Sequence, residues 1–135
     1  MNLTVSTGIR VDHPTSFGRT FTREAVQRAV SDPIFIDAIK RGMMLGGIIN
    51  RGHEHLAMLH EATHIVIGMR IDGDMLVADI QLLDTPKGLE VQRAITHGAK
   101  LVAKPIISLP LDQDTGKGVT IDSEFRIIRV QIETQ

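Results

Sequence analysis

The sequence has 135 residues, of which 42% are hydrophobic, so it is long enough for one domain with a substantial core. A net charge of −1 and four Phe without Trp or Tyr leave neither a basic surface for nucleic acid nor a platform for stacked bases. The absence of cysteine excludes disulfides, and no apolar run approaches a membrane span. We expect a soluble single domain over residues 1–135 that binds neither nucleic acid nor membranes.

The first third of the chain predicts a strand, two short helices and a second strand. Apolar residues indicate the first strand over residues 3–11, and Thr22 can cap a helix that extends through Asp32. Asp32 and Pro33 form an N-cap and first-turn pair for the second helix. The apolar run over residues 43–49 then predicts a buried strand.

The stretch from His64 to Gly98 has the clearest pattern in the sequence. Apolar residues alternate on both sides of Asp72-Gly73, which predicts a hairpin whose tight primed turn has Asp72 and Gly73 at its centre. The residues expected on the buried face are Ile65, Ile67, Met69 and Ile71 in the first strand, and Leu76, Ala78, Ile80 and Leu82 in the second. Turn formers at 84–88 precede a helix that Gly98 would end as a C′ residue.

The last third of the chain predicts two more strands. Residues 100–111 form an apolar run that Pro105 and Pro110 interrupt, which indicates an edge strand or irregular chain. A final strand pattern covers residues 119–132. Because strands outnumber helices, we expect an α+β fold, with a small, mostly antiparallel β-barrel or curved sheet flanked by about three helices.

Three segments of the sequence resemble one protein family. RIDGDMLVADIQLLDTPKGLEVQRAITHGAKL has a strand with an Asp-Gly turn, a Leu-Asp-Thr-Pro-x-Gly loop and a helix ending in Gly. Gly-Arg-Thr-Phe at 18–21 and Gly-His-Glu-His at 52–55 are further matches. All three resemble the bacteriophage prohead core (maturation) proteases of the T4 type, which are serine peptidases with the herpesvirus assemblin fold. The resemblance covers about residues 18–130 and implies an assemblin-like barrel.

Four of the six histidines lie in one stretch, at His53, His55, His60 and His64. The resemblance implies that His53 or His55 would be the general base of a serine protease. The alternative is a polar loop whose histidines are exposed or hydrogen-bonded without a catalytic role.

The sequence His60-Glu61-Ala62-Thr63-His64 also matches the His-Glu-x-x-His pattern of zinc peptidases. On a helix, this spacing would present His60 and His64 to one zinc ion, and Glu61 could polarise a bound water. However, His64 opens a β-branched run that favours a strand, so the two imidazoles should not share a helical face. We therefore expect no metal and no other cofactor.

The nucleophile of the protease family has no counterpart at the expected place. After its helix, the family has a Gly-x-Ser-Ser-Arg-Gly type motif, where this chain has Val-Ala-Lys-Pro-Ile-Ile at 102–107. The nearest serine is Ser108, four residues beyond Lys104 and about 13 Å away in an extended strand. A base must lie roughly 3 Å from the proton that it takes. Pro105 also removes one backbone donor that an oxyanion pocket could use.

We interpret the sequence as a bacteriophage capsid protein on the prohead-protease scaffold, catalytically inactive and acting as a decoration or cement component. The first alternative is an active serine-type maturation protease that uses His53 or His55 with Ser108 to cleave scaffold and capsid proteins. The second is a zinc metallopeptidase. The expected partners are the major capsid protein or other capsid subunits, through oligomer or lattice contacts. The expected location is the virion capsid, and the host cytoplasm during assembly. The apolar residues Met43 and Met44, or the segment 105–111, are candidates for the contact surface.

Overall fold

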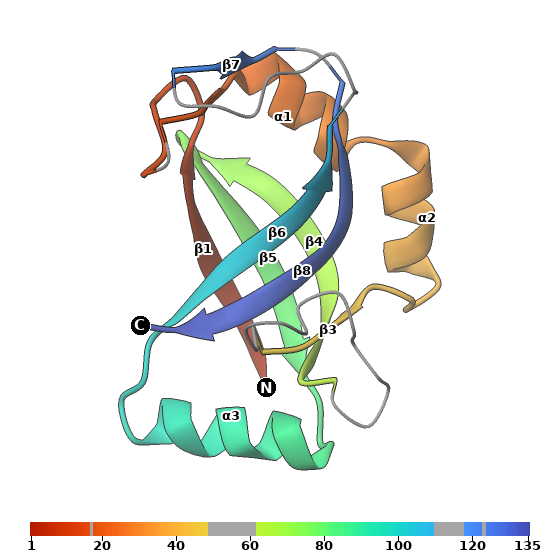
Figure 1. Cartoon of the computed structure of the whole chain (residues 1–135). Helices are drawn as coiled ribbons and strands as arrows, with labels where there is room; N and C mark the ends of the chain where they lie inside the picture. Colours follow the sequence, from red (N-terminus) through yellow and green to blue (C-terminus); the bar gives the residue numbers. More distant parts are fainter. Residues whose placement is uncertain (17, 49–61, 110–117, 123) are drawn as a thin grey trace.

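The computed structural model describes residues 1–16, 18–48, 62–109, 118–122 and 124–135. These residues form two β layers with helices around them (Figure 1). The elements in chain order are β1 (Asn2–Arg10), β2 (Thr20–Phe21), α1 (Arg23–Val30), α2 (Pro33–Lys40), β3 (Leu45–Gly46), β4 (His64–Asp72), β5 (Met75–Leu82), α3 (Pro86–Thr96), β6 (Leu101–Ser108), β7 (Thr120–Ile121) and β8 (Arg126–Thr134). None of the helices in this part of the chain has the length and hydropathy that a membrane crossing requires.

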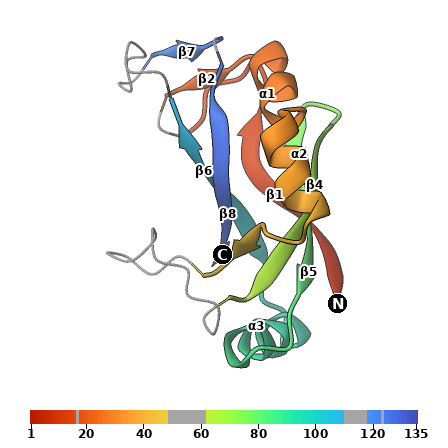
Figure 2. The ribbon, with the colours of Figure 1, turned by 90° about the vertical axis from the view of Figure 1, so that its right-hand side faces the viewer.

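The larger sheet is antiparallel and has the strand order β1-β5-β4-β3. The second layer is the antiparallel pair of β6 and β8, and Figure 2 shows it facing the larger sheet across the core. The short strands β2 and β7 pair in parallel at one end of the molecule. This curled, mostly antiparallel half-barrel with three described helices confirms the expected α+β class.

Backbone pairing joins the two layers along one side but not along the other. Past β3, Ile48 forms an isolated parallel bridge with Ile132 of β8, and the Ile132 amide donates to the Gly47 carbonyl at 3.0 Å. The opposite side of the half-barrel lies between β1 and β6, and no strand pairing joins these two strands in the described chain. The half-barrel therefore has one seam, between β1 and β6.

The β4–β5 hairpin is confirmed, but its two strands follow the expected alternation differently. All four expected residues of β5 are at most 3% exposed: Leu76, Ala78, Ile80 and Leu82. In β4, Val66 is buried and Ile67 is 45% exposed, because a register shift between Val66 and Gly68 inserts one extra residue. The expected buried face was therefore wrong at Ile65 and Ile67, and the partly buried Met69 and Ile71 pack against the core as expected.

The turn of the hairpin lies one residue later than expected. Asp72 pairs with Met75, so the two central residues are Gly73 and Asp74. Only Gly73, with φ of 65°, has a positive φ there. Glycine at the first central position is what a type II′ turn requires, whereas the expected turn would have had positive φ at both positions.

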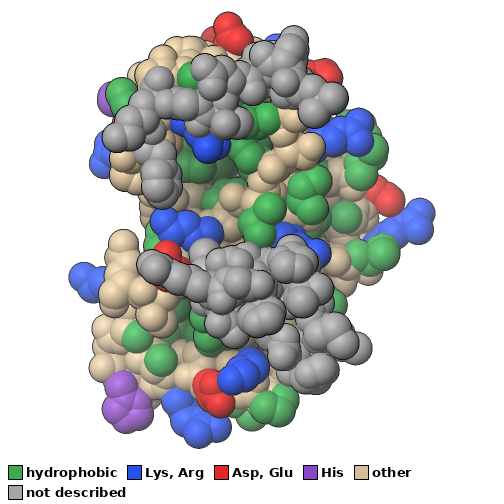
Figure 3. Space-filling model, viewed as in Figure 1, with side chains coloured by type: hydrophobic (Ala, Val, Ile, Leu, Met, Phe, Trp, Pro, Cys, Tyr) green, Lys and Arg blue, Asp and Glu red, His purple; other side chains and the backbone are tan. Residues whose placement is uncertain are grey.

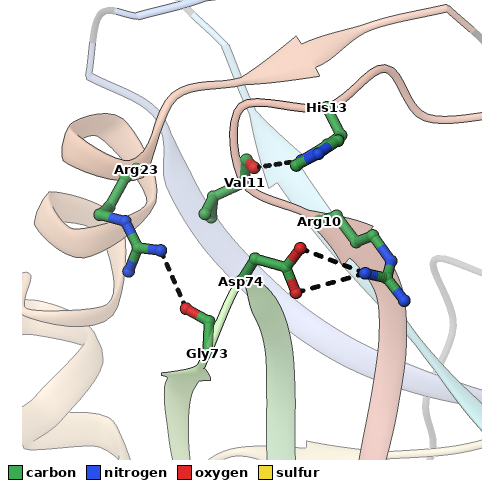
Figure 4. Close-up of polar contacts among 6 residues, drawn as sticks. All are labelled: Arg10, Val11, His13, Arg23, Gly73 and Asp74. Atoms are coloured by element: carbon green, nitrogen blue, oxygen red, sulfur yellow. Dashed lines mark hydrogen bonds and ion pairs between the residues drawn. The ribbon is translucent and has the colours of Figure 1, made fainter.

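The tip of the hairpin is fixed by three contacts to the first part of the chain, and Figure 4 shows the two that involve arginine side chains. The Val11 amide donates to the Asp74 carbonyl at 2.8 Å, and Arg10 forms an ion pair with the Asp74 carboxylate at 3.1 Å. From α1, the Arg23 guanidinium donates to the Gly73 carbonyl at 2.9 Å. His13 lies in the same region, with its Nδ1 2.9 Å from the Val11 carbonyl. The polar groups here hold the hairpin against β1 and α1.

The helix boundaries follow the capping residues. Thr22 caps α1, and Asp32 caps α2 by accepting from the Ile34 amide at 3.0 Å. The first helix ends at Val30, two residues earlier than expected, because Asp32 already begins the next helix. Gly98, with φ of 94°, follows the C-cap of α3 as expected.

Two predicted strands were wrong in extent. Of the strand expected over 43–49, the described residues 43–48 contain only the two-residue β3, and Met43 is 68% exposed. The strand expected over 119–132 is divided into β7 and β8, because β7 pairs with β2 and β8 pairs with β6. The expected edge strand near 100–111 is confirmed as β6, in which Pro105 pairs with Val130.

Candidate functional site

The β6–β8 ladder contains the position where the resemblance implies a nucleophile. Ala103 lies opposite Ile132, and both side chains are buried in the core. Since neighbouring residues of a strand point to opposite faces, Lys104 lies on the outer face, opposite Gln131. The outer face of this ladder is therefore the candidate site.

Lys104 forms a loose ion pair at this position. Its Nζ lies 3.9 Å from Glu133 Oε2, and the two side chains are 44% and 47% exposed. An exposed pair at this distance contributes little to stability. Where a serine hydroxyl is expected, the ladder therefore presents a partly solvated ammonium group beside a carboxylate.

Ser108 is the last residue of β6 and is exposed, opposite Arg126. Within the described ranges, the histidines are His13, His64 and His97, and none of them is hydrogen-bonded to Ser108. The two candidate bases, His53 and His55, lie outside the described residues. The described geometry therefore places Ser108 at a solvated strand end.

His64 is fully buried at the start of β4 and has a hydrogen-bond partner at each ring nitrogen. Nε2 donates to the Val130 carbonyl at 2.8 Å, which leaves Nδ1 to accept from the Thr63 hydroxyl at 2.8 Å. Burial lowers the pKa of His64 below its ordinary value, and the bond to Val130 opposes this shift only in part. The neutral ring therefore joins β4 to β8.

The hydrogen bonds of His64 argue against zinc binding by the His-Glu-x-x-His pattern. His60 and Glu61 lie outside the described residues, whereas His64 begins a strand, as expected. Because both of its nitrogens are engaged, His64 has no free lone pair for a metal. Elsewhere in the described chain, His, Asp and Glu side chains form no group of three or more that could hold a metal ion.

Hydrogen bonds join Gly46 and Gly47, which precede the segment 49–61, to Thr63 after this segment and to β8. The Thr63 amide donates to the Gly46 carbonyl at 2.9 Å, and the Gly47 amide donates to Gln131 Oε1 at 2.8 Å. The side chain of Gln131 is 2% exposed although it lies on the outer face of the ladder. The role of Gln131 could not be predicted from the sequence, because a single glutamine in an apolar strand carries no motif.

A cavity of about 610 Å³ lies at the seam between β1 and β6. The segment 7–9 of β1 forms one wall, and β6 residues including Lys104 and Pro105 form the other. Arg19 and Phe21 also line the cavity. Figure 3 shows hydrophobic side chains next to lysine and arginine side chains on this face of the molecule. No motif predicted the cavity, because its walls come from separate parts of the chain.

No protein-family model matches the sequence, and no curated protein matches it either. The structure is similar to that of the bacteriophage T4 capsid assembly protease, gp21, with a TM-score of 0.72 and 15% sequence identity. The similarity covers 98% of this chain and 80% of the T4 protein. It shows that the two proteins share a fold, and it agrees with the barrel that the sequence resemblance implied.

Proposed function

We propose that this chain is a bacteriophage capsid protein of the prohead-protease kind that has lost its nucleophile and acts as a structural component of the capsid. The observation that carries the proposal is the pair Lys104 and Pro105 on β6, where the resemblance implies the attacking serine. Decoration or cementing of the shell is the role that we propose.

Two features of the ladder argue against hydrolysis. Ser108 is four positions beyond Lys104 in a continuous strand, which corresponds to about 13 Å and not to the roughly 3 Å of a catalytic hydrogen bond. Pro105 has no backbone N–H, so this part of the strand has one donor fewer for a developing oxyanion. Acyl transfer needs both a nucleophile and that donor, and the described part of β6 supplies neither at position 104.

The fold gives the proposal its context. The T4 protein of similar fold is described as a capsid assembly protease. A shared fold alone does not transmit an activity, because function depends on the groups at the site. We therefore carry over the setting, which is the capsid and its assembly in the host cytoplasm. The partners that we propose are the major capsid protein or other capsid subunits.

Exposed apolar side chains support a role in contacts with other subunits. Met43 is 68% exposed after α2, and Ile34, Ile128 and Ile67 are 60%, 51% and 45% exposed. Met44 is 7% exposed and belongs to the core, so Met43 is the better candidate of the two. A stable contact would bury about 1,000 Å² or more in total. Apolar side chains of this size on a surface are typical of interaction sites when they are contiguous.

The first test asks whether the protein cleaves anything. The parent protein and the Ser108→Ala variant should both leave capsid and scaffold proteins intact, because no described base faces Ser108. A fluorophosphonate probe should label neither protein, and Ser31→Ala is the control for an exposed serine elsewhere, at the C-cap of α1. A cleavage product or a label that depends on Ser108 would overturn the proposal. It would favour the active protease that uses His53 or His55.

The second test asks where the protein is found. Quantitative mass spectrometry of mature, DNA-filled particles should find copy numbers comparable to that of the major capsid protein. A shell component must persist in the particle, whereas a maturation protease is needed in few copies and only during assembly. Presence in proheads and absence from mature particles would contradict the structural role.

The zinc alternative has its own measurement. Elemental analysis of the purified protein should find no stoichiometric zinc, since His64 uses both ring nitrogens within the fold. One zinc per chain, lost in His60→Ala, would restore the metallopeptidase as a candidate.

A further inference from the structure

The cavity at the seam between β1 and β6 borders the face of the ladder considered above as a protease site, because Lys104 and Glu133 also line the cavity. Its volume of about 610 Å³ falls within the range of about 300–1,000 Å³ that is common for small-molecule sites. Most of its lining is apolar, with side chains such as Phe21, Leu76, Ile107 and Phe125. An apolar body would therefore be well accommodated in it.

Arg19 is the polar group that lacks a partner at this cavity. It lines the wall, and its Nε is buried with no hydrogen-bond partner in the described structure. The carboxylate of Glu133 lies on the same cavity but faces Lys104, at 3.9 Å. A buried polar group without a partner is unfavourable. An anion in the cavity would give the guanidinium the partner that the protein does not provide.

Both walls of the cavity are poor templates for an added β-strand. On β1, the Gly8 amide donates to the Ser6 hydroxyl at 3.0 Å, and the Ile9 amide donates to the Thr7 hydroxyl at 3.1 Å. On β6, Pro105 has no N–H to offer. An extended peptide binds such an edge mainly through backbone hydrogen bonds. The cavity is therefore better suited to a small molecule than to a peptide.

The local shape of β1 opens the cavity. The pairing of β1 with β5 is irregular between Ser6 and Arg10, and Gly8 has φ of 74° with open space where a side chain would lie. Irregularities of this kind turn a strand away from its neighbour and are frequent beside binding sites.

We propose that this cavity binds a small organic anion, namely an aliphatic or aromatic body that carries one carboxylate, and that Arg19 pairs with the carboxylate. The proposal is independent of whether the chain cleaves proteins. It concerns a free small molecule, and a peptide ligand is an alternative that the test separates from it.

The probes are octanoate, octanol and a heptapeptide with blocked ends in which valine alternates with glutamate. Titrations followed by amide chemical shifts should show that octanoate binds and shifts signals of residues 7–9 and Arg19. A charge-assisted contact predicts that octanol binds about tenfold more weakly. Equal binding of octanol, or shifts confined to α2 or α3, would overturn the proposal. A peptide that binds as tightly as octanoate would also overturn it.

The variant that tests the assignment is Arg19→Gln, and Arg93→Gln on the exposed face of α3 is its matched control. Arg19→Gln should weaken octanoate binding about tenfold or more, while Arg93→Gln should bind like the parent. Without ligand, the melting temperature of Arg19→Gln should equal or exceed that of the parent, since the Nε that lacks a partner is removed. A lower melting temperature with unchanged octanoate affinity would assign Arg19 a purely structural role and overturn the proposal.

Discussion

The strands β5 and β6 differ in what constrains their residues: core packing in β5, and both core packing and the chemistry of the candidate site in β6. Alternate residues of β5 are buried against the core, and any well-packed aliphatic residue could meet that demand. In β6, one face packs on the core while the other has Lys104 at the candidate site, where chemistry requires one particular group. Under the proposed function, hydrophobic patterning preserves the fold while a change at one position removes the reaction. Four predictions test this contrast.

The largest expected effect is in the core of β5. Ile80 is fully buried, so Ile80→Ala should lower the free energy of unfolding by about 2–5 kcal/mol through lost burial and the cavity left behind. The control is Ile128→Ala, which removes a side chain that is 51% exposed. This variant should change the free energy of unfolding by about 0.5 kcal/mol or less. Urea denaturation at one pH measures both. Similar losses at the two sites would contradict the assignment of β5 to the core and of Ile128 to the surface.

The next effect concerns the close approach of β3 to β8. A Cβ at Gly46 would overlap the Val130 carbonyl oxygen and the His64 ring, so Gly46→Ala should cost about 3 kcal/mol. Gly68→Ala is the matched control in β4, because its added Cβ would meet its nearest atom, Asp79 Oδ2, at an ordinary 3.6 Å. Thermal unfolding compares the two variants. A harmless Gly46→Ala would show that β3 and β8 are less tightly joined than described.

A smaller effect should depend on pH. The pKa of His64 is lowered from 6.5 in the folded state, so below pH 6.5 the unfolded chain binds more protons than the folded protein. The stability contributed by the neutral ring is thus complete above pH 6.5 and declines as the pH falls toward the lowered value. His64→Asn should be less stable overall and show a weaker decline. Urea midpoints between pH 8 and pH 5 test this, and parallel curves for parent and variant would exclude His64 as the cause.

The smallest effect is expected at the candidate site itself. The pair of Lys104 and Glu133 is long and about half exposed, so Lys104→Gln should change the free energy of unfolding by about 0.5 kcal/mol or less. Chemical denaturation at low and high salt measures this value. A loss above about 1 kcal/mol would mean that Lys104 is retained for stability. The presence of a lysine at this position would then be weaker support for the proposed loss of a nucleophile.

Local patterns predicted most of the individual elements. The alternation in β5 was correct at all four positions, and the caps Thr22 and Asp32 marked real helix starts. The pattern failed at Ile67, because a bulge changes which face a residue occupies without any signal in composition. The apolar pattern also predicted one strand over residues 119–132 where the structure has β7 and β8. The two strands are separate because β7 pairs with β2 and β8 pairs with β6, and apolar content does not indicate pairing partners.

The candidate site was predictable only in part. The lysine at position 104, where the resemblance implies a serine, could be identified from the sequence because it is one residue within a recognisable run. The structural role of His64 could not, since its two partners include the Val130 carbonyl, 66 residues away in the sequence. His53 and His55 lie outside the described residues, and their role stays a prediction.

Side-chain periodicity and capping act over a few residues, so the sequence by itself determined the order and type of the main elements and the α+β class. The tertiary structure decided which strands meet. The closure through Gly47 and Ile132, the burial of Gln131 and the seam between β1 and β6 depend on contacts between distant segments. Such contacts depend on how the two layers pack against each other. No local pattern predicts the cavity beside Arg19, because this cavity forms only when the two layers have packed together.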